Sequence, residues 1–335
     1  MAVLVTGGSG VIGLHVAREF AGRGHDVVAY STSGAPLHAE LVLGELARRV
    51  TFEKGNILDL NRLRQVAEAR GVEGIVHTAA LTGEAQARGR PHDVFAVNVS
   101  GMSNVLEVAR VANMRRVVYL GSASEYGRRA ELRPIREEEI APEGMYAESK
   151  FLAHRLGQRY RHVFGLDVIT VRVSSAYGPN TRFNPFRKLV GNTLIAHLCR
   201  AAATGETLVL EGGGDYPRDW TYAADTAQGI CLAYLAQSPR HTEYNIASGR
   251  SYTLDDVVAA LRRVAPQAQI TVGAGKWDDD PFQALNLRGP LDITRATVDL
   301  GYVRRYELED GLREYIAWWR AVVAREPAVA LGAAR

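Results

Sequence analysis

The chain of 335 residues is poor in cysteine and has no excess of charge of one sign. Its two cysteines, Cys199 and Cys231, have no CxxC spacing and no histidines clustered around them, which argues against a zinc site and a disulfide framework. We therefore predict no metal, and we interpret both thiols as small buried groups of a cytoplasmic protein. The net charge is only +3, and no dense basic run with interleaved aromatic residues is present. This balance argues against a nucleic-acid partner.

The chain also lacks an uninterrupted apolar run long enough to span a membrane. It starts directly with "MAVLVTGG", without the charged segment, apolar core and cleavage site of an export signal. We therefore expect a cytoplasmic location and no membrane partner. With 47% hydrophobic residues, the chain can bury a large core, either in one large domain or in two that pack closely.

Short apolar runs alternate with amphipathic stretches through the first half of the chain. This pattern is typical of a parallel sheet with helices on both faces. The predicted fold is α/β, a doubly wound parallel sheet of the Rossmann type. Its predicted strands lie near 2–6, 26–30, 50–53, 74–78, 116–121 and 167–172, and its predicted helices lie near 11–23, 59–69, 94–112 and 146–163.

After residue 175 the alternation becomes less regular. We predict a dinucleotide-binding domain over 1–175, to which 221–247 returns, and a smaller mixed α/β substrate-binding domain over 176–335. The elements predicted in this half are helices near 187–203, 222–236, 253–264 and 308–322 and strands at "TLVLEGG" and "EYNIAS". The tail 326–335 is predicted to be a frayed terminus.

The first predicted strand runs into the glycine-rich segment "TGGSGVIG". Gly8, Gly10 and Gly13 match the pattern GxGxxG, and Gly7 with the last two gives the related spacing GxxGxxG. Glycine permits a tight turn and a close approach of the backbone to a pyrophosphate, while the start of a helix provides amide groups for the phosphates. Because the motif follows a predicted strand and opens a predicted helix, the predicted ligand is a dinucleotide.

A second short motif, "MYAESK" at 145–150, has two interpretations when it is taken alone. Tyr146 and Lys150 lie four residues apart, so on a helix they share one face. They could form a solvated surface pair or a catalytic pair, and the rest of the chain has to decide between the two.

Ten segments follow one another along the chain in the order and with the spacing of a known family. They are "TGGSGVIG", "GNILD", "VHTAA", "FAVNVSG", "LGSASEYG", "YAESK", "RVSSAYGP", "GGGDYPRDWTYAAD", "YNIASG" and "LEDGLREYIAWW". With these segments the chain resembles the extended short-chain dehydrogenase/reductases. This is the NAD-dependent epimerase/dehydratase group, which acts mostly on nucleotide-diphosphate sugars. The resemblance runs nearly from end to end.

The resemblance implies three catalytic residues, Ser122, Tyr146 and Lys150. Tyr146 would act as general base or acid, and Lys150 would hold the nicotinamide ribose and lower the pKa of the phenol. A free phenol has a pKa of about 10, and a nearby ammonium group and an oxidised nicotinamide ring would favour the phenolate. The hydroxyl of Ser122 would hold the substrate oxygen by a hydrogen bond.

The resemblance also implies a set of residues that bind the cofactor. Two positions depart from the family pattern: Ser31 and Thr32 stand where an acidic residue usually binds the adenosine ribose, and Asn56 stands where an Asp often contacts adenine. We predict NAD as the cofactor and leave NADP open. Asp59 is predicted to cap the next helix. The predicted cofactor-binding residues are Gly7, Gly10, Val11, Ile12, Gly13, Ser31, Thr32, Asn56, Ile57, Ala79, Ala80, Asn98, Tyr146 and Lys150.

For the substrate, the resemblance implies that Arg218 and Arg288 grip a diphosphate, for which a planar guanidinium is well suited. Asp219 and Asp225 are interpreted as structural, the first as a buried ion-pair partner and the second as a helix-start residue. Ser175 stands where many relatives carry Asn, which leaves a changed or non-nucleotide substrate open. The predicted substrate-binding residues are Ser122, Ser124, Ser175, Arg218 and Arg288.

We therefore predict an NAD(P)-dependent epimerase of nucleotide-diphosphate sugars that acts through a transient keto-sugar, and we expect a homodimer. The alternative is a net dehydrogenase or reductase of a small sugar or hydroxy compound. A non-catalytic cofactor-binding scaffold is disfavoured because the three predicted catalytic residues are intact. The related 4,6-dehydratases carry Thr-Asp-Glu where this chain has Ser122, Ala123 and Ser124. Since Glu125 lies one position away from that pattern, dehydration is not expected.

Overall fold

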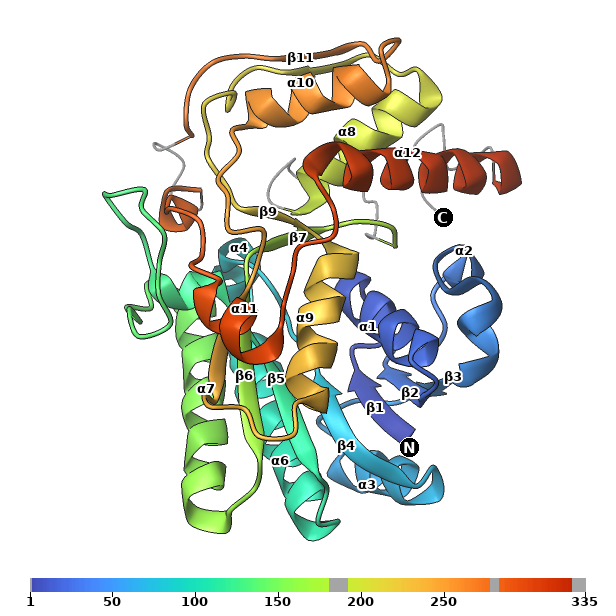
Figure 1. Cartoon of the computed structure of the whole chain (residues 1–335), viewed down its shortest axis with the longest axis vertical. Coiled ribbons are helices and arrows are strands. Elements are labelled where there is room, and N and C mark those ends of the chain that lie inside the picture. The colour runs from blue at the N-terminus through green and yellow to red at the C-terminus, as the bar shows by residue number, and fades with distance from the viewer. Residues whose placement is uncertain (1, 181–191, 278–282, 327–335) are drawn as a thin grey trace.

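A computed structural model describes residues 2–180, 192–277 and 283–326 of the chain (Figure 1). Its centre is a sheet of seven parallel strands in the order β10-β6-β5-β4-β1-β2-β3. The strand order reverses its direction between β1 and β4, which is the point where open α/β sheets bind their ligands. The strands are β1 (Ala2–Thr6), β2 (Asp26–Ser31), β3 (Val50–Lys54), β4 (Val72–His77), β5 (Arg116–Ser122), β6 (Val168–Val173) and β10 (Glu243–Ile246).

Helices cover both faces of this sheet, as the apolar pattern of β1 requires. Val3 and Val5 pack into a core with α1 (Val11–Gly22) and α9 (Ala223–Leu235). Leu4 points to the opposite face, where a second core contains residues of α3 (Leu60–Ala69), α6 (Gly101–Val111) and α7 (Met145–Phe164). Because successive side chains of a strand alternate between faces, an uninterrupted apolar strand is buried on both sides. Figure 1 shows α9 in front of the sheet.

A third core lies above the carboxyl edge of the sheet (upper part of Figure 1). Three helices build it: α8 (Asn192–Thr204), α10 (Leu254–Val264) and α12 (Leu308–Arg325). Two short parallel strand pairs accompany them, β8 (Leu208–Leu210) with β11 (Ile270–Val272) and β7 (Ser175–Tyr177) with β9 (Trp220–Tyr222). We call this upper part the cap.

The predicted fold class is confirmed, and so are the six predicted strands of the first half. The predicted return of 221–247 corresponds to α9 and β10, which pack on the sheet and extend it. The division into domains at residue 175 stays a prediction. The helix predicted over 187–203 lies within the described residues only from Asn192, where α8 begins. Of the predicted frayed tail, only residue 326 is described.

The single helix predicted over 94–112 has a more complex course. The chain forms α5 (Pro91–Phe95), winds as a π-helix over Ala96–Ser100 (η2), and continues as α6. Other segments were not predicted because three to seven residues are too few to show a helical or strand period. Besides β7, β9 and β11, these are α2 (Ala39–Leu43), η1 (Gly44–Arg49), α4 (Glu84–Gly89), η3 (Ala123–Tyr126), η4 (Ala284–Asn286) and α11 (Thr294–Leu300).

Two buried aspartates join the cap to the sheet. Asp225 lies in the first turn of α9, near the helix start where it was predicted, and its carboxylate accepts the backbone N–H groups of Arg305 and Tyr306 just before α12. Asp219 was predicted to be an ion-pair partner, but its carboxylate accepts hydrogen bonds from neutral groups instead. Burial raises the pKa of Asp219, while these hydrogen bonds oppose the rise. The donors to Asp219 are the side chains of Thr221 and Ser248 and the backbone N–H groups of Ser248, Gly249 and Leu291.

We predict that Asp219→Ala lowers the free energy of unfolding by about 3 kcal/mol or more, because each buried donor left without a partner costs about 1–3 kcal/mol. The matched control is Asp215→Ala, since Asp215 is exposed and its carboxylate accepts one backbone N–H, from Gly275. That change should cost about 1 kcal/mol or less. Urea denaturation followed by circular dichroism measures both values, and equal losses would contradict this role of Asp219.

Candidate active site

The glycine-rich segment forms a tight loop at the end of β1. Gly7 has a φ of +70°, and its N–H donates a hydrogen bond to the carbonyl of Tyr30 over 2.8 Å. A Cβ atom on Gly7 would lie 2.8 Å from the nitrogen of Ala79, and one on Gly13 would lie 2.2 Å from the carbonyl oxygen of Gly7. Side chains at these two positions would therefore force the loop apart, which accounts for the glycines.

The N-terminus of α1 follows this loop directly and has no side-chain cap. Gly10 is its N-cap and provides no side-chain hydrogen bond, and the helix begins with Val11 and Ile12. The first amide groups of a helix have no partner within the helix, and they carry a partial positive charge. This glycine cradle, with its helix N-terminus, fits the pyrophosphate of a dinucleotide.

At the end of β2, hydroxyl groups replace the acidic residue that a ribose usually meets. The hydroxyl of Ser31 donates to the carbonyl of Gly34 over 3.1 Å, and the hydroxyls of Ser33 and Ser9 lie 2.8 Å apart. Thr32 is exposed. The link between Ser9 and Ser33 joins the glycine loop to the loop after β2, so both walls of this part of the cradle are held together.

The loop after β3 carries the next two predicted cofactor residues. Asn56 is exposed, and its side-chain oxygen already accepts the N–H of Leu58 over 3.0 Å. An amide oxygen has a second lone pair, so one further donor can still bind it. Ile57 is buried beneath the loop. Asp59 caps α3 as predicted, because its carboxylate accepts the N–H of Arg62 over 2.9 Å.

The segment after β4 includes Ala79 and Ala80, which are partly exposed at the carboxyl edge. Asn98, in the π-helical turn, holds this segment in place. Its side-chain oxygen accepts the N–H of Leu81, and its nitrogen donates to the carbonyl of Leu81 and to the hydroxyl of Ser149 on α7. Both protons of this amide are engaged, so the geometry favours a supporting role for Asn98 over direct contact with a cofactor.

Ser122 lies where β5 ends and η3 begins. Its hydroxyl accepts hydrogen bonds from the N–H and the hydroxyl of Ser124. Its backbone N–H donates to the carboxylate of Glu125 over 2.8 Å. The sequence places Glu125 one position away from the dehydratase pattern, and the structure shows its carboxylate buried behind Ser122.

Tyr146 and Lys150 both lie in the first turns of α7 and face the end of β5. Burial raises the pKa of Tyr146 to about 12, the hydrogen bond with the Ser122 side chain opposes this rise, and the charge of Glu125 adds to it. The lowered pKa expected from the sequence is therefore absent in the protein alone, because burial outweighs the other influences. Burial also lowers the pKa of Lys150 to about 8. The ammonium donates to the carbonyl of Leu120 and lies 4.5 Å from the ring centre of Tyr119.

Arg218 and Arg288 are both buried in the cap, each with 9% exposure. The guanidinium of Arg288 donates to the carbonyls of Gly127 and Leu285, and that of Arg218 donates to the hydroxyl of Tyr216. Burial and then the charge of Arg218 lower the pKa of Arg288 to about 10, so the two cations influence each other. Within the described residues, neither forms an ion pair with a carboxylate. The charge of Glu143 acts on Arg288 from farther away. Buried cations without a contacting carboxylate favour a site for an anion.

Two residues near Tyr146 were not predicted to support the site. One is Glu125, whose carboxylate accepts the backbone N–H of Ser122. The other is Glu84 on α4, whose carboxylate accepts the backbone N–H of Tyr146. Glu84 and Arg88 form an i,i+4 pair, which is typical of exposed helix surfaces, so the sequence carries no sign of its burial. Ser175 lies in β7, and its N–H donates to the carbonyl of Asp219.

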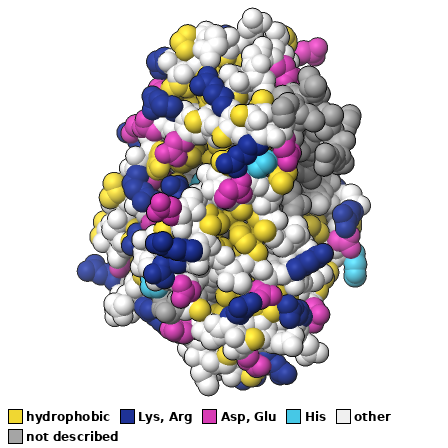
Figure 2. Space-filling view, turned by 90° about the vertical axis from the view of Figure 1, so that its right-hand side faces the viewer, with side chains coloured by type: hydrophobic (Ala, Val, Ile, Leu, Met, Phe, Trp, Pro, Cys, Tyr) yellow, Lys and Arg dark blue, Asp and Glu magenta, His cyan; other side chains and the backbone are white. Residues whose placement is uncertain are grey.

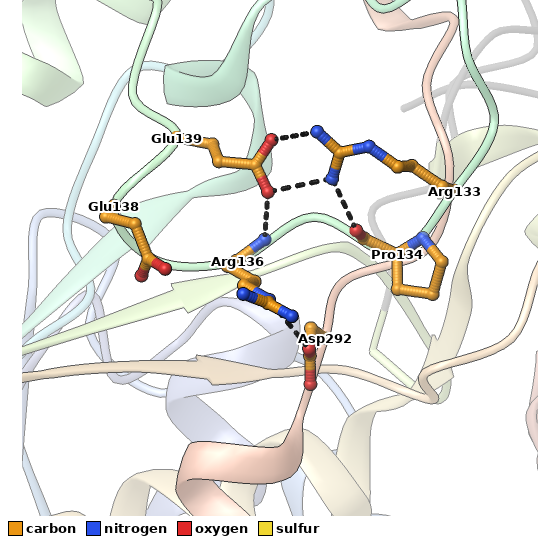
Figure 3. A pocket seen from close by; sticks show the side chains of 6 residues that line it. All are labelled: Arg133, Pro134, Arg136, Glu138, Glu139 and Asp292. Carbon is orange, nitrogen blue, oxygen red and sulfur yellow. Dashed lines mark hydrogen bonds and ion pairs between the residues drawn. The ribbon is translucent and has the colours of Figure 1, made fainter.

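A pocket of about 580 Å³ lies outside this site (Figure 3). Its charged residues are neutralised in pairs: Arg133 with Glu139, and Arg136 with Asp292, while Glu138 pairs with Arg295. None of the predicted site residues lines it. The lining residues are Arg133, Pro134, Arg136, Glu138, Glu139 and Asp292.

Other features of the described residues agree with the composition. Lys and Arg side chains are interspersed with Asp and Glu on the face shown in Figure 2. Both cysteines are buried and free, and burial raises the pKa of the Cys231 thiol to about 12. Over the described ranges, no three His, Cys, Asp or Glu side chains are grouped so that they could hold a metal ion. In this part of the chain, every helix is too short or too polar to cross a bilayer.

The dinucleotide cradle at the reversal of strand order, together with a Tyr–Lys pair on one helix beside it, defines an enzyme of the short-chain dehydrogenase/reductase class. More narrowly, residues 3–247 match the NAD dependent epimerase/dehydratase family, and the chain belongs to this family. Membership confirms the predicted family and its cofactor, NAD.

Individual relatives are distant but cover nearly the whole chain. UDP-glucuronate 4-epimerase 2 of Arabidopsis thaliana is 25% identical over 95% of this chain and 76% of its own length. UDP-N-acetyl-alpha-D-glucosaminuronate decarboxylase of Bacillus cytotoxicus is 26% identical over 95% of this chain and 98% of its own. The crystal structure of UDP-glucose 4-epimerase of Thermotoga maritima with UDP-glucose gives a TM-score of 0.82 at 23% identity, covering 96% of this chain and 100% of that one.

We predict that Gly13→Ala weakens NAD binding by at least about tenfold, since the new Cβ would collide with the Gly7 carbonyl and move the cradle. Isothermal titration with NAD measures the loss. The matched control is Gly22→Ala at the other end of α1, where the nearest atom to a Cβ is a side-chain carbon of Leu46 at 3.6 Å. An unchanged dissociation constant for Gly13→Ala would remove this loop from the cofactor site.

Proposed function

We propose that the protein is an NAD-dependent epimerase of nucleotide-diphosphate sugars. The observation that carries the proposal is the pairing of the Ser122 and Tyr146 side chains at the carboxyl end of β5, with the neutral residues Ala123 and Ser124 next to them. Ser122 and Tyr146 can move one proton to and from a hydroxyl group. Ala123 and Ser124 offer no carboxyl group for eliminating water.

In the proposed reaction, the hydroxyl of Ser122 holds the oxygen of a sugar carbinol, and Tyr146 takes the proton of that oxygen. When bound, NAD would supply reversible hydride transfer at the carbinol carbon, by way of a transient keto-sugar. Tyr146 then gives its proton back to the oxygen. Because burial raises the pKa of Tyr146 to about 12 in the protein alone, the phenolate would have to be favoured by positive charge brought near it, and the oxidised nicotinamide ring of bound NAD would supply such a charge.

The cofactor would be held along the carboxyl edge of the sheet. The glycine cradle and the amides at Val11 and Ile12 would bind its pyrophosphate, and the hydroxyl-rich loop at Ser31 and Thr32 would line its adenosine end. Lys150 would hold the nicotinamide ribose. Asn98 would act indirectly, by fixing Leu81 and Ser149.

The substrate diphosphate would lie between the sheet and the cap at Arg218 and Arg288. This assignment is supported by the burial of two guanidinium groups without a carboxylate partner in the described residues. The names of the relatives agree with it, since the epimerases of Arabidopsis thaliana and Thermotoga maritima are named for UDP-sugars. The sugar itself stays open, as does the effect of Ser175, where many relatives have Asn.

We predict that Tyr146→Phe reduces the interconversion of UDP-sugar epimers at least about 100-fold, because only the ionisable oxygen is lost. NAD affinity should stay within about threefold of the unmodified protein. Product analysis by nuclear magnetic resonance should show inverted carbinols and no 4-keto-6-deoxy sugar. Stoichiometric release of NADH would favour the dehydrogenase alternative, and loss of CO2 would favour a decarboxylase.

We predict that Arg218→Ala weakens binding of a UDP-sugar by about 1.5–3 kcal/mol, the value of a hydrogen bond to a charged group. The affinity for NAD should not change. A matched control is Arg250→Ala, because Arg250 is exposed and pairs with Glu307 at the surface. Equal UDP-sugar affinity in both variants would place the diphosphate elsewhere.

We further infer a cytoplasmic homodimer that associates through α6 and α7. Exposed apolar side chains gather where these helices end, at Val111, Val163 and Phe164, and Arg110 lies over the Phe164 ring. Phe164→Glu should convert the dimer to a monomer in sedimentation equilibrium, because it buries a charge in the proposed interface. A monomeric unmodified protein would contradict this inference.

A further inference from the structure

Two buried carboxylates approach the backbone of the two proposed acid–base residues from behind. One oxygen of Glu125 accepts the N–H of Ser122 over 2.8 Å, and one oxygen of Glu84 accepts the N–H of Tyr146 over 2.9 Å. The Glu125 residue has no exposed surface, and Glu84 is 9% exposed. Each proposed acid–base residue thus has its amide nitrogen bound to a carboxylate from a neighbouring element.

A glycine beside each contact leaves room for it. A Cβ on Gly121 would lie 2.8 Å from an oxygen of Glu125, and a Cβ on Gly144 would lie 2.7 Å from an oxygen of Glu84. Both carboxylates are also anchored on their far sides. Glu125 pairs with the fully buried Arg172 over 2.9 Å, and Glu84 pairs with Arg88 over 3.0 Å.

The two contacts cap helices in different ways. At the start of η3, Ser122 and Glu125 form a capping box, in which the Glu125 carboxylate accepts the N–H of Ser122. Gly144 at the start of α7 gives no side-chain hydrogen bond to the helix, and Glu84 instead accepts the N–H groups of Met145 and Tyr146. A carboxylate at this end also interacts favourably with the helix dipole. The first turn of α7, which carries Tyr146, is therefore fixed to α4 as well as to the sheet.

We propose that Glu84 and Glu125 are positioning residues that set the separation of the Ser122 and Tyr146 hydroxyls by holding their backbone nitrogens. This inference rests on the proposed function, in which the two hydroxyls share one substrate oxygen. Misplacement of a reacting group by about 1 Å can cost about 100-fold in rate. Holding the backbone on both sides of that oxygen is therefore expected to affect turnover more than substrate binding.

Glu125 has an electrostatic effect besides. Its charge raises the pKa of both Tyr146 and Lys150. Removing that charge should lower the pKa of Tyr146, so its phenolate should form at a lower pH. The titratable and charged groups of the elements packed against α7 are Glu107 and Arg110 on α6, Arg116 and Tyr119 on β5, Glu125 and Tyr126 on η3, Arg172 on β6, Glu84 and Arg88 on α4, and His92 and Asp93 on α5. Those of α7 besides Tyr146 are Glu148, Lys150, His154, Arg155, Arg159, Tyr160, Arg161 and His162.

The test compares Glu84→Gln and Glu125→Gln with Glu137→Gln. Glu137 is a matched control because it is 4% exposed and accepts a backbone N–H, from Asn245, but does not contact Ser122 or Tyr146. We expect the first two variants to lower kcat for UDP-sugar interconversion by about 10- to 100-fold. The KM of these two variants should change less than about threefold. The kcat of Glu137→Gln should stay within about threefold of the unmodified protein. An equal fall of kcat in all three variants would overturn the proposal.

A second measurement does not depend on turnover. The absorbance of the Tyr146 phenolate is obtained by subtracting the titration of a Tyr146→Phe partner from that of each protein. Glu125→Gln should move the midpoint to lower pH, and an unmoved midpoint would overturn the electrostatic part. If Glu125→Gln does not fold because Arg172 keeps only Glu243 as a counter-charge, the double variant Glu125→Gln/Arg172→Gln removes the charges of both partners and takes its place. Absence of epimerase activity in the unmodified protein would refute the proposed function while leaving this titration decisive.

Discussion

The close contact between the loop after β1 and the segment after β4 is the constraint on which the site depends. Gly7 approaches Ala79 so closely that no side chain fits between them. This approach is possible because β1 and β4 are hydrogen-bonded neighbours whose carboxyl ends reach the same edge of the sheet. The helix that follows β1 therefore presents its first amides beside the β4 loop, and β5, next to β4, places Ser122 at the same edge.

Buried charge organises the layer behind this edge. Glu125, Arg172 and Glu243 form a chain of ion pairs that runs from Ser122 to the outer strand β10. Such pairs give little net stability, because the cost of removing charges from water offsets their attraction. They do specify geometry, since an unpaired member would be costly. The position of Ser122 is thus coupled to the pairing of β6 with β10.

The sequence was sufficient to predict the sheet, while the roles of the proposed site residues stay predictions. Long apolar strands and periodic helices carry strong local patterns, and the glycine spacing of the first loop has a direct steric cause in Gly7 and Gly13. The sequence was insufficient to predict the partners and the burial of charged side chains that are set by tertiary contacts. The carboxylate of Asp219 binds neutral donors from three segments, and Glu84 is buried although its spacing to Arg88 is typical of a surface pair. In the protein alone, burial raises the pKa of Tyr146, and the lowering expected with an oxidised nicotinamide beside it stays a prediction.

The two buried arginines of the cap have a consequence for the stability of the whole chain. Arg218 and Arg288 repel each other, and the charge of Glu143 opposes that repulsion at Arg288 without forming an ion pair with either guanidinium in the described residues. An anion bound between them would relieve that repulsion only in the folded state, because the unfolded chain separates the two residues. Ligand binding and folding are then thermodynamically linked, and stability rises with the logarithm of the ligand concentration. If the proposed sugar nucleotide binds there, the stability of the cap would rise with the concentration of its own substrate.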